Sequence, residues 1–224
     1  MKLLIGTHNP SKLRAMQANF APEDDVQCVS PASFQLHVTI PEDARDALGN
    51  AMQKALAYHR ATGLPTLAED SGLVFLDLPP EHPDQPGVHV RRMVDGHVME
   101  DDEEMLRWYQ AIAHRHGGRL RASWQDAYCL VLDEAHIYTR ADSPEELYPY
   151  AFEMMDTPCA ARNEGWPIDS LSVCPYNGRY FADMTREERI RAYQAGIGEA
   201  TSYHAVRDWL RSLCCAAARP AGAL

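Results

Sequence analysis

The sequence lacks any run of about 20 apolar residues, the length that a membrane-spanning helix needs. Its first residues also lack the apolar centre of a secretory signal peptide, so we expect neither a membrane protein nor an exported one. Positive charge is scarce, because 21 Lys and Arg oppose 32 Asp and Glu for a formal net charge of -11. This balance argues against a nucleic acid or an anionic membrane as the main partner, although a local basic cluster can still bind a small anion.

Cysteine motifs that bind metal or exchange disulfides are also missing. None of the 6 cysteines forms a C-x-x-C motif, and the neighbours Cys214 and Cys215 suit a helix better than a disulfide. We therefore expect reduced thiols in a cytoplasmic protein. The sequence does contain 46% hydrophobic residues, enough to bury a core as one large or two small domains.

The stretch from Leu67 to Leu73 places two adjacent acids, Glu69 and Asp70, between an apolar run and a Ser71-Gly72 pair. Neighbouring residues of a strand face opposite sides, so both acids reach one pocket only if the backbone breaks. Gly72 permits such a break, and we predict a strand that ends or kinks here. One acid could then hold a divalent cation while the other orients or deprotonates water. A turn with two solvated acids is the alternative, and the commoner outcome for a lone pair.

A candidate anion site follows the first predicted strand, residues 2–6. A polar loop leads from it into a helix predicted from Leu13 to about Phe20, a layout that aims backbone N–H groups at an anion. Lys12 adds a cation in the first helical turn, where the helix dipole disfavours it unless an anion is present. The candidate residues are Thr7, His8, Asn9, Pro10, Ser11 and Lys12. A surface lysine after an ordinary loop is an equal alternative.

A second helix is predicted from Asp43 to about Thr62, where apolar residues recur at helical spacing. Gly63 and a following proline end it. Asp46, Asn50 and Lys54 lie one turn apart, so an acid, an amide and a base share one face. A solvated helix face would look the same.

The remaining elements follow from the same periodicities. We predict strands at 26–29, 34–40, 127–132 and 137–140, an amphipathic helix at 101–116 and a final helix around 206–213.

Four motifs occur in order along the chain. They are Thr7-His8-Asn9-Pro10-Ser11-Lys12, Asn50-Ala51-Met52-Gln53-Lys54-Ala55, Ala68-Glu69-Asp70-Ser71-Gly72-Leu73 and Pro86-Gly87-Val88-His89. The series resembles the inosine/xanthosine triphosphate pyrophosphatase family, whose members hydrolyse non-standard purine nucleoside triphosphates to monophosphate and pyrophosphate. Each motif is short, and their shared order and spacing carry the resemblance.

Three C-terminal segments extend this resemblance. They are Gly165-Trp166-Pro167-Ile168-Asp169, Phe181-Ala182-Asp183-Met184 with the following residues to Arg189, and Ser202-Tyr203-His204. The first implies purine stacking on Trp166 and ribose or base contacts near Asp169, since an aromatic ring has the means to stack on a base. Arg189 stands where the family has lysine. His204 matches the family's histidine, with Tyr203 as the alternative.

The chain also departs from the family pattern. Gly49 stands where the family carries a metal-binding glutamate, and Ala15 stands where the first motif usually ends in Glu. Pro167 replaces a glycine and stiffens its loop. For the missing metal ligand we expect Glu69 first, Asp46 second and Glu42 third.

The resemblance implies an α/β fold, with a long twisted mixed sheet flanked by helices and two lobes around a central substrate cleft. Residues 1–213 would form this domain, 214–224 a disordered tail, and the chain a homodimer. Mg²⁺ would assist hydrolysis of the α–β phosphate bond, with Asp70 as metal ligand or general base. Lys12, Lys54, Ser71 and Gly72 would hold the triphosphate together with the loop from Thr7 to Ser11.

Two other functions remain open. One is a nucleotide-binding sensor or inhibitor on the same fold, which the loss of the glutamate at Gly49 favours. The other is an unrelated phosphohydrolase acting on another phosphorylated metabolite, with Trp166 structural only.

Overall fold

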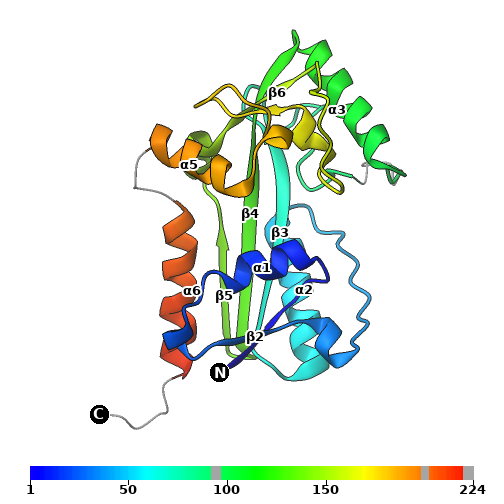
Figure 1. Cartoon of the computed structure of the whole chain (residues 1–224). Coiled ribbons are helices and arrows are strands. Elements are labelled where there is room, and N and C mark those ends of the chain that lie inside the picture. Colours follow the sequence, from blue (N-terminus) through cyan, green and yellow to red (C-terminus); the bar gives the residue numbers. More distant parts are fainter. Residues whose placement is uncertain (92–96, 198–201, 219–224) are drawn as a thin grey trace. The chain divides into compact units, whose positions relative to one another are not determined.

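The computed structural model describes residues 1–91, 97–197 and 202–218 (Figure 1). Its strands are β1 (Lys2–Ile5), β2 (Gln27–Val29), β3 (Thr66–Phe75), β4 (Arg119–Asp133), β5 (His136–Ala141), β6 (Phe152–Met155) and β7 (Ser172–Val173). Its α-helices are α1 (Pro10–Gln17), α2 (Ala47–Thr62), α3 (Asp102–Arg115), α4 (Pro144–Leu147), α5 (Arg186–Ile197) and α6 (Ser202–Ala218). No helix among these residues is long and apolar enough to cross a membrane.

The strands form one mixed sheet in the order β2-β1-β3-β4-β6-β7, with β5 paired to β4. β1 pairs in parallel with β2 and β3, whereas β4 is antiparallel to β5 and β6. The long strands β3 and β4 are neighbours in this order (Figure 1). The prediction of an α/β protein with a mixed sheet flanked by helices is therefore confirmed.

The chain divides into two compact units. Unit 1 contains Met1–Ser71, Asp126–Ala141 and the described part of Thr201–Leu224, and unit 2 contains Gly72–Gln125 and the described part of Asp142–Ala200. β3 and β4 each contribute residues to both units. The substrate cleft predicted between two lobes stays a prediction.

In unit 1, alternate residues of β3 pack against different helices. Leu67 belongs to a core with Met16 of α1 and Leu210 of α6, whereas Ala68 belongs to a core with Ala51 of α2. Successive strand residues point to opposite faces, so this alternation assigns one face of β3 to α1 and α6 and the other to α2.

The core of unit 2 forms around the amphipathic helix α3. Its buried face includes Leu106, Tyr109 and Ile112, which pack with Phe75 of β3 and Phe152 of β6. The Tyr109 hydroxyl is deeply buried and donates a hydrogen bond of 2.9 Å to the Val90 carbonyl oxygen. The helix predicted at 101–116 is thus confirmed to within a residue at each end.

Two helix boundaries differ from the predicted ones because of capping side chains. α2 begins at Ala47 rather than Asp43, since Asp46 is its N-cap and accepts a hydrogen bond from the Gly49 N–H group. α1 begins at Pro10 rather than Leu13, and the Asn9 side chain accepts from the Lys12 backbone N–H group as a cap would. Gly63 ends α2 in the left-handed conformation with φ 67°, as predicted.

Two further predictions are wrong. The strand predicted at 34–40 is absent: Pro31–Phe34 forms a 3₁₀ turn and Gln35 has a left-handed φ of 51°, which an extended strand does not allow. The tail predicted at 214–224 begins too early, because α6 continues through Ala218 and buries Cys214 in the core of unit 1. Residues 219–224 lie outside the described residues.

Candidate functional site

The strand that carries Glu69 and Asp70 does not break. β3 runs continuously from Thr66 to Phe75, so the predicted kink is wrong. Gly72 serves another purpose, because a Cβ atom there would lie 2.9 Å from the Gly87 carbonyl oxygen. The next residue, Leu73, donates its N–H group to that same oxygen at 2.8 Å. The glycine therefore allows two backbone segments to approach closely rather than turning the strand.

Because β3 is unbroken, its two acids face opposite sides. Glu69 shares the face of Leu67, toward α1, and its Oε1 atom lies 3.2 Å from Nζ of Lys12. Asp70 shares the face of Ala68, toward α2, and its Oδ1 atom lies 2.6 Å from Nζ of Lys54. The expectation that both acids turn into one pocket is wrong, since strand alternation is preserved.

Asp70 is held by two donors from α2. Lys54 binds its Oδ1 atom, and Nδ2 of Asn50 donates to its Oδ2 atom at 3.0 Å. The predicted face of α2 bearing Asn50 and Lys54 is thus directed at Asp70. Only 13% of each side chain of the Lys54–Asp70 pair is exposed, so the pair is weakly screened by water.

Lys54 also contacts a second carboxylate. Its Nζ atom lies 2.8 Å from Oε2 of Glu42, in the segment that leads into α2. Burial pushes the Lys54 pKa down, but hydrogen bonds to Asp70 and Glu42 outweigh it and the pKa is raised. One ammonium group therefore contacts two carboxylates and offsets only one of their two negative charges.

Lys12 forms the corresponding arrangement on the other face of β3. Its Nζ atom donates to Oγ of Ser71 at 3.3 Å, and that hydroxyl donates to Oε1 of Glu69 at 2.9 Å. The loop before α1 is ordered by its own side chains, since Thr7 Oγ1 accepts from the Asn9 N–H group at 3.1 Å. Lys12 is thereby fixed in the first turn of α1, as predicted.

The other predicted loop residues are distributed around this turn. His8, Asn9 and Pro10 are exposed, and the His8 ring lies edge-on to Tyr58 with centroids 6.3 Å apart. His8 also borders a hollow of about 580 Å³ lined by residues 32 and 35–37. The side chain of Ser11 lies outside the described residues.

The expected metal ligand Asp46 has another partner. As the N-cap of α2, its Oδ1 atom accepts from the Gly49 N–H group at 2.8 Å. Glu42, ranked third from the sequence, is the carboxylate that shares Lys54 with Asp70. No sequence signal reveals this contact, because it depends on the path of an irregular segment.

In unit 2 the predicted base-contacting residues form one cluster. Arg189 of α5 donates through Nη2 to Oδ2 of Asp169 at 2.8 Å, and Nδ2 of Asn163 donates to the same oxygen at 3.2 Å. The Asp169 N–H group donates to the Trp166 carbonyl oxygen, so the acid and the aromatic residue share one tight turn. Trp166 is 44% exposed, whereas Asp169 is buried. The side chain of His204 lies outside the described residues.

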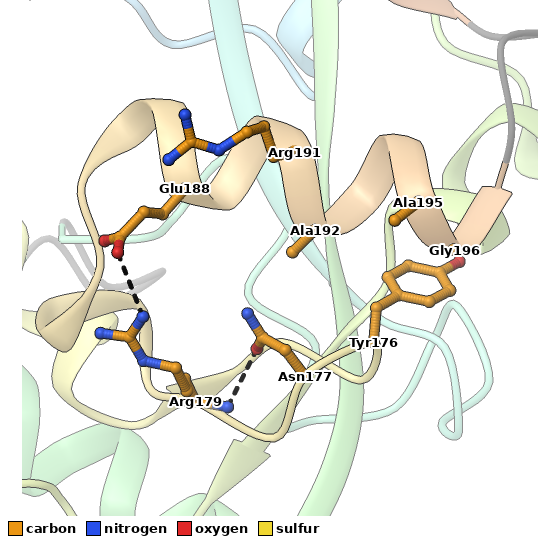
Figure 2. Close-up of a pocket in the computed structure, with 8 residues that line it drawn as sticks. All are labelled: Tyr176, Asn177, Arg179, Glu188, Arg191, Ala192, Ala195 and Gly196. Carbon is orange, nitrogen blue, oxygen red and sulfur yellow. Dashed lines mark hydrogen bonds and ion pairs between the residues drawn. The ribbon is translucent and has the colours of Figure 1, made fainter.

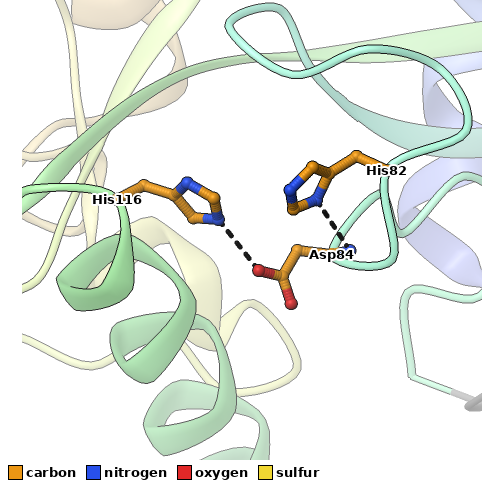
Figure 3. A group of neighbouring side chains, drawn as sticks. All are labelled: His82, Asp84 and His116. Atoms are coloured by element: carbon orange, nitrogen blue, oxygen red, sulfur yellow. Dashed lines mark hydrogen bonds and ion pairs between the residues drawn. The ribbon is translucent and has the colours of Figure 1, made fainter.

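Unit 2 also contains a group of possible metal ligands that sequence reasoning missed (Figure 3). Ligand atoms of His82, Asp84 and His116 all lie within 4.8 Å of one another. Nε2 of His116 lies 2.8 Å from Oδ2 of Asp84, and Nη2 of Arg115 lies 2.6 Å from its Oδ1 atom. Two imidazoles and a carboxylate suit a transition metal better than Mg²⁺, which prefers oxygen ligands.

A surface hollow of about 510 Å³ lies beside α5 (Figure 2). Tyr176, Asn177 and Arg179 line one side, and Arg179 donates to the Glu188 carboxylate at 3.3 Å across it. The hollow includes none of the site residues predicted from the sequence.

The chain combines a mixed α/β sheet with two lysine–carboxylate contacts on opposite faces of β3. The match to the Ham1 family extends over residues 3–193, which make up most of the chain. The chain belongs to this family, so the resemblance found from its motifs is confirmed.

Named relatives agree with this assignment, and solved structures share the fold. The dITP/XTP pyrophosphatase of Thermus thermophilus is 29% identical over 208 residues, which cover 93% of each chain. That of Gluconobacter oxydans is 38% identical over 92 residues, 41% of each chain. A HAM1 protein from Coxiella burnetii has TM-score 0.67 at 21% identity, covering 95% of this chain and 98% of that one. The Staphylococcus aureus Ham1 protein has TM-score 0.65 at 16% identity, covering 95% and 97%. These two structures show the shared fold.

Proposed function

We propose that this chain is a nucleoside-triphosphate pyrophosphatase. It would hydrolyse the bond between the α- and β-phosphates and release a nucleoside monophosphate and pyrophosphate. The observation that carries the proposal is the pair of lysine–carboxylate contacts on β3, Lys12 with Glu69 and Lys54 with Asp70. The dITP/XTP pyrophosphatase of Thermus thermophilus supports it, because its alignment covers 93% of this chain.

The two lysines would bind the phosphates. Each ammonium is held beside a carboxylate, and each is positioned by a helix, α1 for Lys12 and α2 for Lys54. A triphosphate offers both lysines more negative charge than one carboxylate does, so they can exchange part of their present contacts for phosphate oxygens. Lys12 also lies at the start of α1, where backbone N–H groups favour an anion.

Asp70 would activate the attacking water. Both of its oxygens accept hydrogen bonds from α2, which fixes the orientation of the carboxylate. When Lys54 turns toward a phosphate, the Oδ1 atom of Asp70 becomes available either to accept a proton from water or to bind a metal ion. Positioned general bases typically raise rates by about 10²- to 10⁴-fold.

The donor set around Asp70 fits a hard divalent cation such as Mg²⁺. Glu42 and Asp70 already present carboxylate oxygens to one cationic group, the Lys54 ammonium, and carboxylate oxygen is the ligand that Mg²⁺ prefers. When bound, Mg²⁺ would neutralise phosphate charge that otherwise repels the attacking water. The lysines and the α1 loop would still position the substrate.

A non-standard purine nucleotide is the proposed substrate. Trp166 exposes part of its indole, which gives a face on which a purine can stack. Asp169, Arg189 and His204 are the further base or ribose contacts expected from the family motifs.

A cytoplasmic homodimer remains part of the proposal, and light scattering of the purified protein tests the oligomer.

Pyrophosphate release from a panel of nucleotides, with and without Mg²⁺, tests this function. We expect dITP and XTP to release pyrophosphate and nucleoside monophosphate, with little turnover of CTP. Binding of these nucleotides without turnover would instead favour the sensor function, to which the glycine at position 49 points. Release of orthophosphate from simple phosphomonoesters alone would favour an unrelated phosphohydrolase.

A further inference from the structure

Unit 2 holds a group of metal-binding side chains to which the proposed reaction gives no role (Figure 3). One ligand atom from each of His82, Asp84 and His116 lies within 4.8 Å of the other two. Ligands at tetrahedral angles about 2.1 Å from a zinc ion lie about 3.4 Å apart, so the widest pair needs to approach by at most about 1.4 Å. All three residues are half-buried, so bulk water reaches them only in part.

The loop that carries the first two ligands is held in place by its own hydrogen bonds. The Gln85 side chain accepts from the Phe75 N–H group at 2.9 Å and donates to the Phe75 carbonyl oxygen at 2.8 Å, which fastens the loop to the end of β3. The His82 N–H group donates to the Pro79 carbonyl oxygen, and the His82 carbonyl oxygen accepts from the Gln85 N–H group. Ligands on a backbone fixed in this way are placed before an ion arrives.

The third ligand comes from the end of α3. His116 is the C-cap of this helix, and its N–H group donates to the Ala113 carbonyl oxygen at 3.1 Å and to that of Ile112 at 3.3 Å. The helix itself is anchored in the core of unit 2 by its buried face. A loop and a helix end that are 32 residues apart in sequence therefore meet at this group.

The present hydrogen bonds prepare the three side chains for an ion. Nδ1 of His82 accepts from the Asp84 N–H group at 3.1 Å, so His82 is a neutral imidazole, the form that binds metal. Nε2 of His116 donates to Oδ2 of Asp84 at 2.8 Å, and an ion would take the place of that proton. Arg115 binds the other oxygen of Asp84, Oδ1, at 2.6 Å and so leaves Oδ2 for His116 or an ion. Outer partners of this kind commonly orient a ligating carboxylate.

We propose that His82, Asp84 and His116 form a second metal site, which binds Zn²⁺ or a similar transition-metal ion and clips residues 79–85 to the end of α3. Two imidazole nitrogens and one carboxylate oxygen are ligands that Zn²⁺ accepts, whereas Mg²⁺ prefers oxygen ligands. Water would fill the fourth position. The site shares no residue with the cation proposed at Asp70, so it does not depend on the proposed function.

Calorimetric titration of the full-length protein with Zn²⁺ tests this site. The protein carries no affinity tag, and excess Mg²⁺ is present to occupy sites made of oxygen alone. We expect His82→Gln and His116→Gln each to weaken Zn²⁺ binding about tenfold or more, since even the loss of an outer partner commonly costs that much. The matched control is His114→Gln, which removes an imidazole paired with Asp156 at 2.9 Å from the same helix and should leave the affinity within about twofold of the wild type.

Thermal unfolding of the same variants measures the clip directly. Zn²⁺ at about 100 times its Kd should raise Tm by about 5 to 10 °C in the wild type and in His114→Gln, and by much less in the two ligand variants. Each variant is compared with itself without Zn²⁺, so a loss of stability from the missing hydrogen bond does not affect the result.

The proposal fails if the wild type binds no Zn²⁺. Equal Zn²⁺ affinity of His116→Gln and His114→Gln would also overturn it, because the ion would then be bound by other side chains of the chain.

Discussion

The guanidinium of Arg189 is bound to Asp169 and stacked on Phe181 at once. Nη2 donates to Oδ2 of Asp169 at 2.8 Å and to the Phe181 carbonyl oxygen at 3.3 Å, while Cζ lies 4.1 Å from the centroid of the Phe181 ring. A planar fork can make these contacts together, whereas a lysine ammonium is a point donor that cannot also stack flat. The arginine at position 189, where the family motif leads one to expect lysine, is thus explained by its neighbours in this chain.

Arg189→Lys should therefore destabilise the protein. Losing one charge-assisted hydrogen bond and the stacking contact costs about 1.5 kcal/mol, or about 3 to 6 °C in Tm for a chain of this size. Scanning calorimetry measures the shift. Arg186→Lys, at an exposed position of the same helix, is the matched control and should leave Tm nearly unchanged. An equal Tm for both variants would remove the structural reason for arginine at position 189.

Asp70→Asn should abolish most turnover while the fold survives. The amide offers one acceptor instead of two, so its NH₂ group must face a donor, either Lys54 or Asn50. We expect kcat to fall about 10²- to 10⁴-fold, as for the loss of a general base, with a stability loss of about 1 to 3 kcal/mol. Pyrophosphate release and urea unfolding measure the two effects. Glu134→Gln, an exposed acid in a turn, is the control, and near-normal kcat in folded Asp70→Asn would refute the role of Asp70.

Lys12→Met should weaken triphosphate binding. The variant removes the ammonium beside Ser71 and Glu69, so the phosphates lose one charged donor. A charge-assisted hydrogen bond contributes about 1.5 to 3 kcal/mol, which predicts a 10- to 100-fold fall in kcat/KM. Initial rates at varied dITP measure this. Lys2→Met removes the same charge from an exposed position in unit 1, and a similar loss in that variant would indicate a general electrostatic effect instead.

The sequence predicted those parts of the site that depend on neighbours in the chain. The loop-then-helix layout predicted Lys12 in the first turn of α1, although that helix begins at Pro10 and not at Leu13, and Asn50 and Lys54 share one face because they are one helical turn apart. Such local rules hold whatever surrounds them.

The parts that depend on distant residues were not predictable. Gly72 was interpreted as a break, but its role is set by Gly87, which only the folded chain brings close. Glu42 reaches Lys54 through a left-handed φ, and the irregular segment before α2 packs on Gly49 through Ala44; neither feature has a periodic signature. Strand alternation by itself requires Glu69 and Asp70 to face apart, and the predicted break at Gly72 led to the wrong expectation.

A last prediction concerns acid stability and the contact between Asp24 and α6. Oδ1 of Asp24 accepts from Nη2 of Arg211 at 2.6 Å and from Nε at 3.1 Å, and Oδ2 accepts from the Ala21 N–H group at 2.7 Å. The backbone hydrogen bond from Ala21 lowers the pKa of Asp24 most, and Arg211 lowers it further against the effect of burial. Residues far apart in sequence are joined by this one carboxylate.

The sign of the pH effect follows from this lowered pKa. A carboxyl group with a lower pKa in the folded state stabilises the fold above its unfolded pKa, about 3.9, and this contribution is lost as pH falls through the folded pKa. Asp24→Asn should thus be less stable than the wild type at pH 6, and the difference should shrink steadily below about pH 4. Urea midpoints across this range measure the difference, with Asp25→Asn as the control for an adjacent acid. A difference that stays constant down to pH 2 would mean that the ionised carboxylate contributes nothing, and that Asp24 acts there through its shape alone.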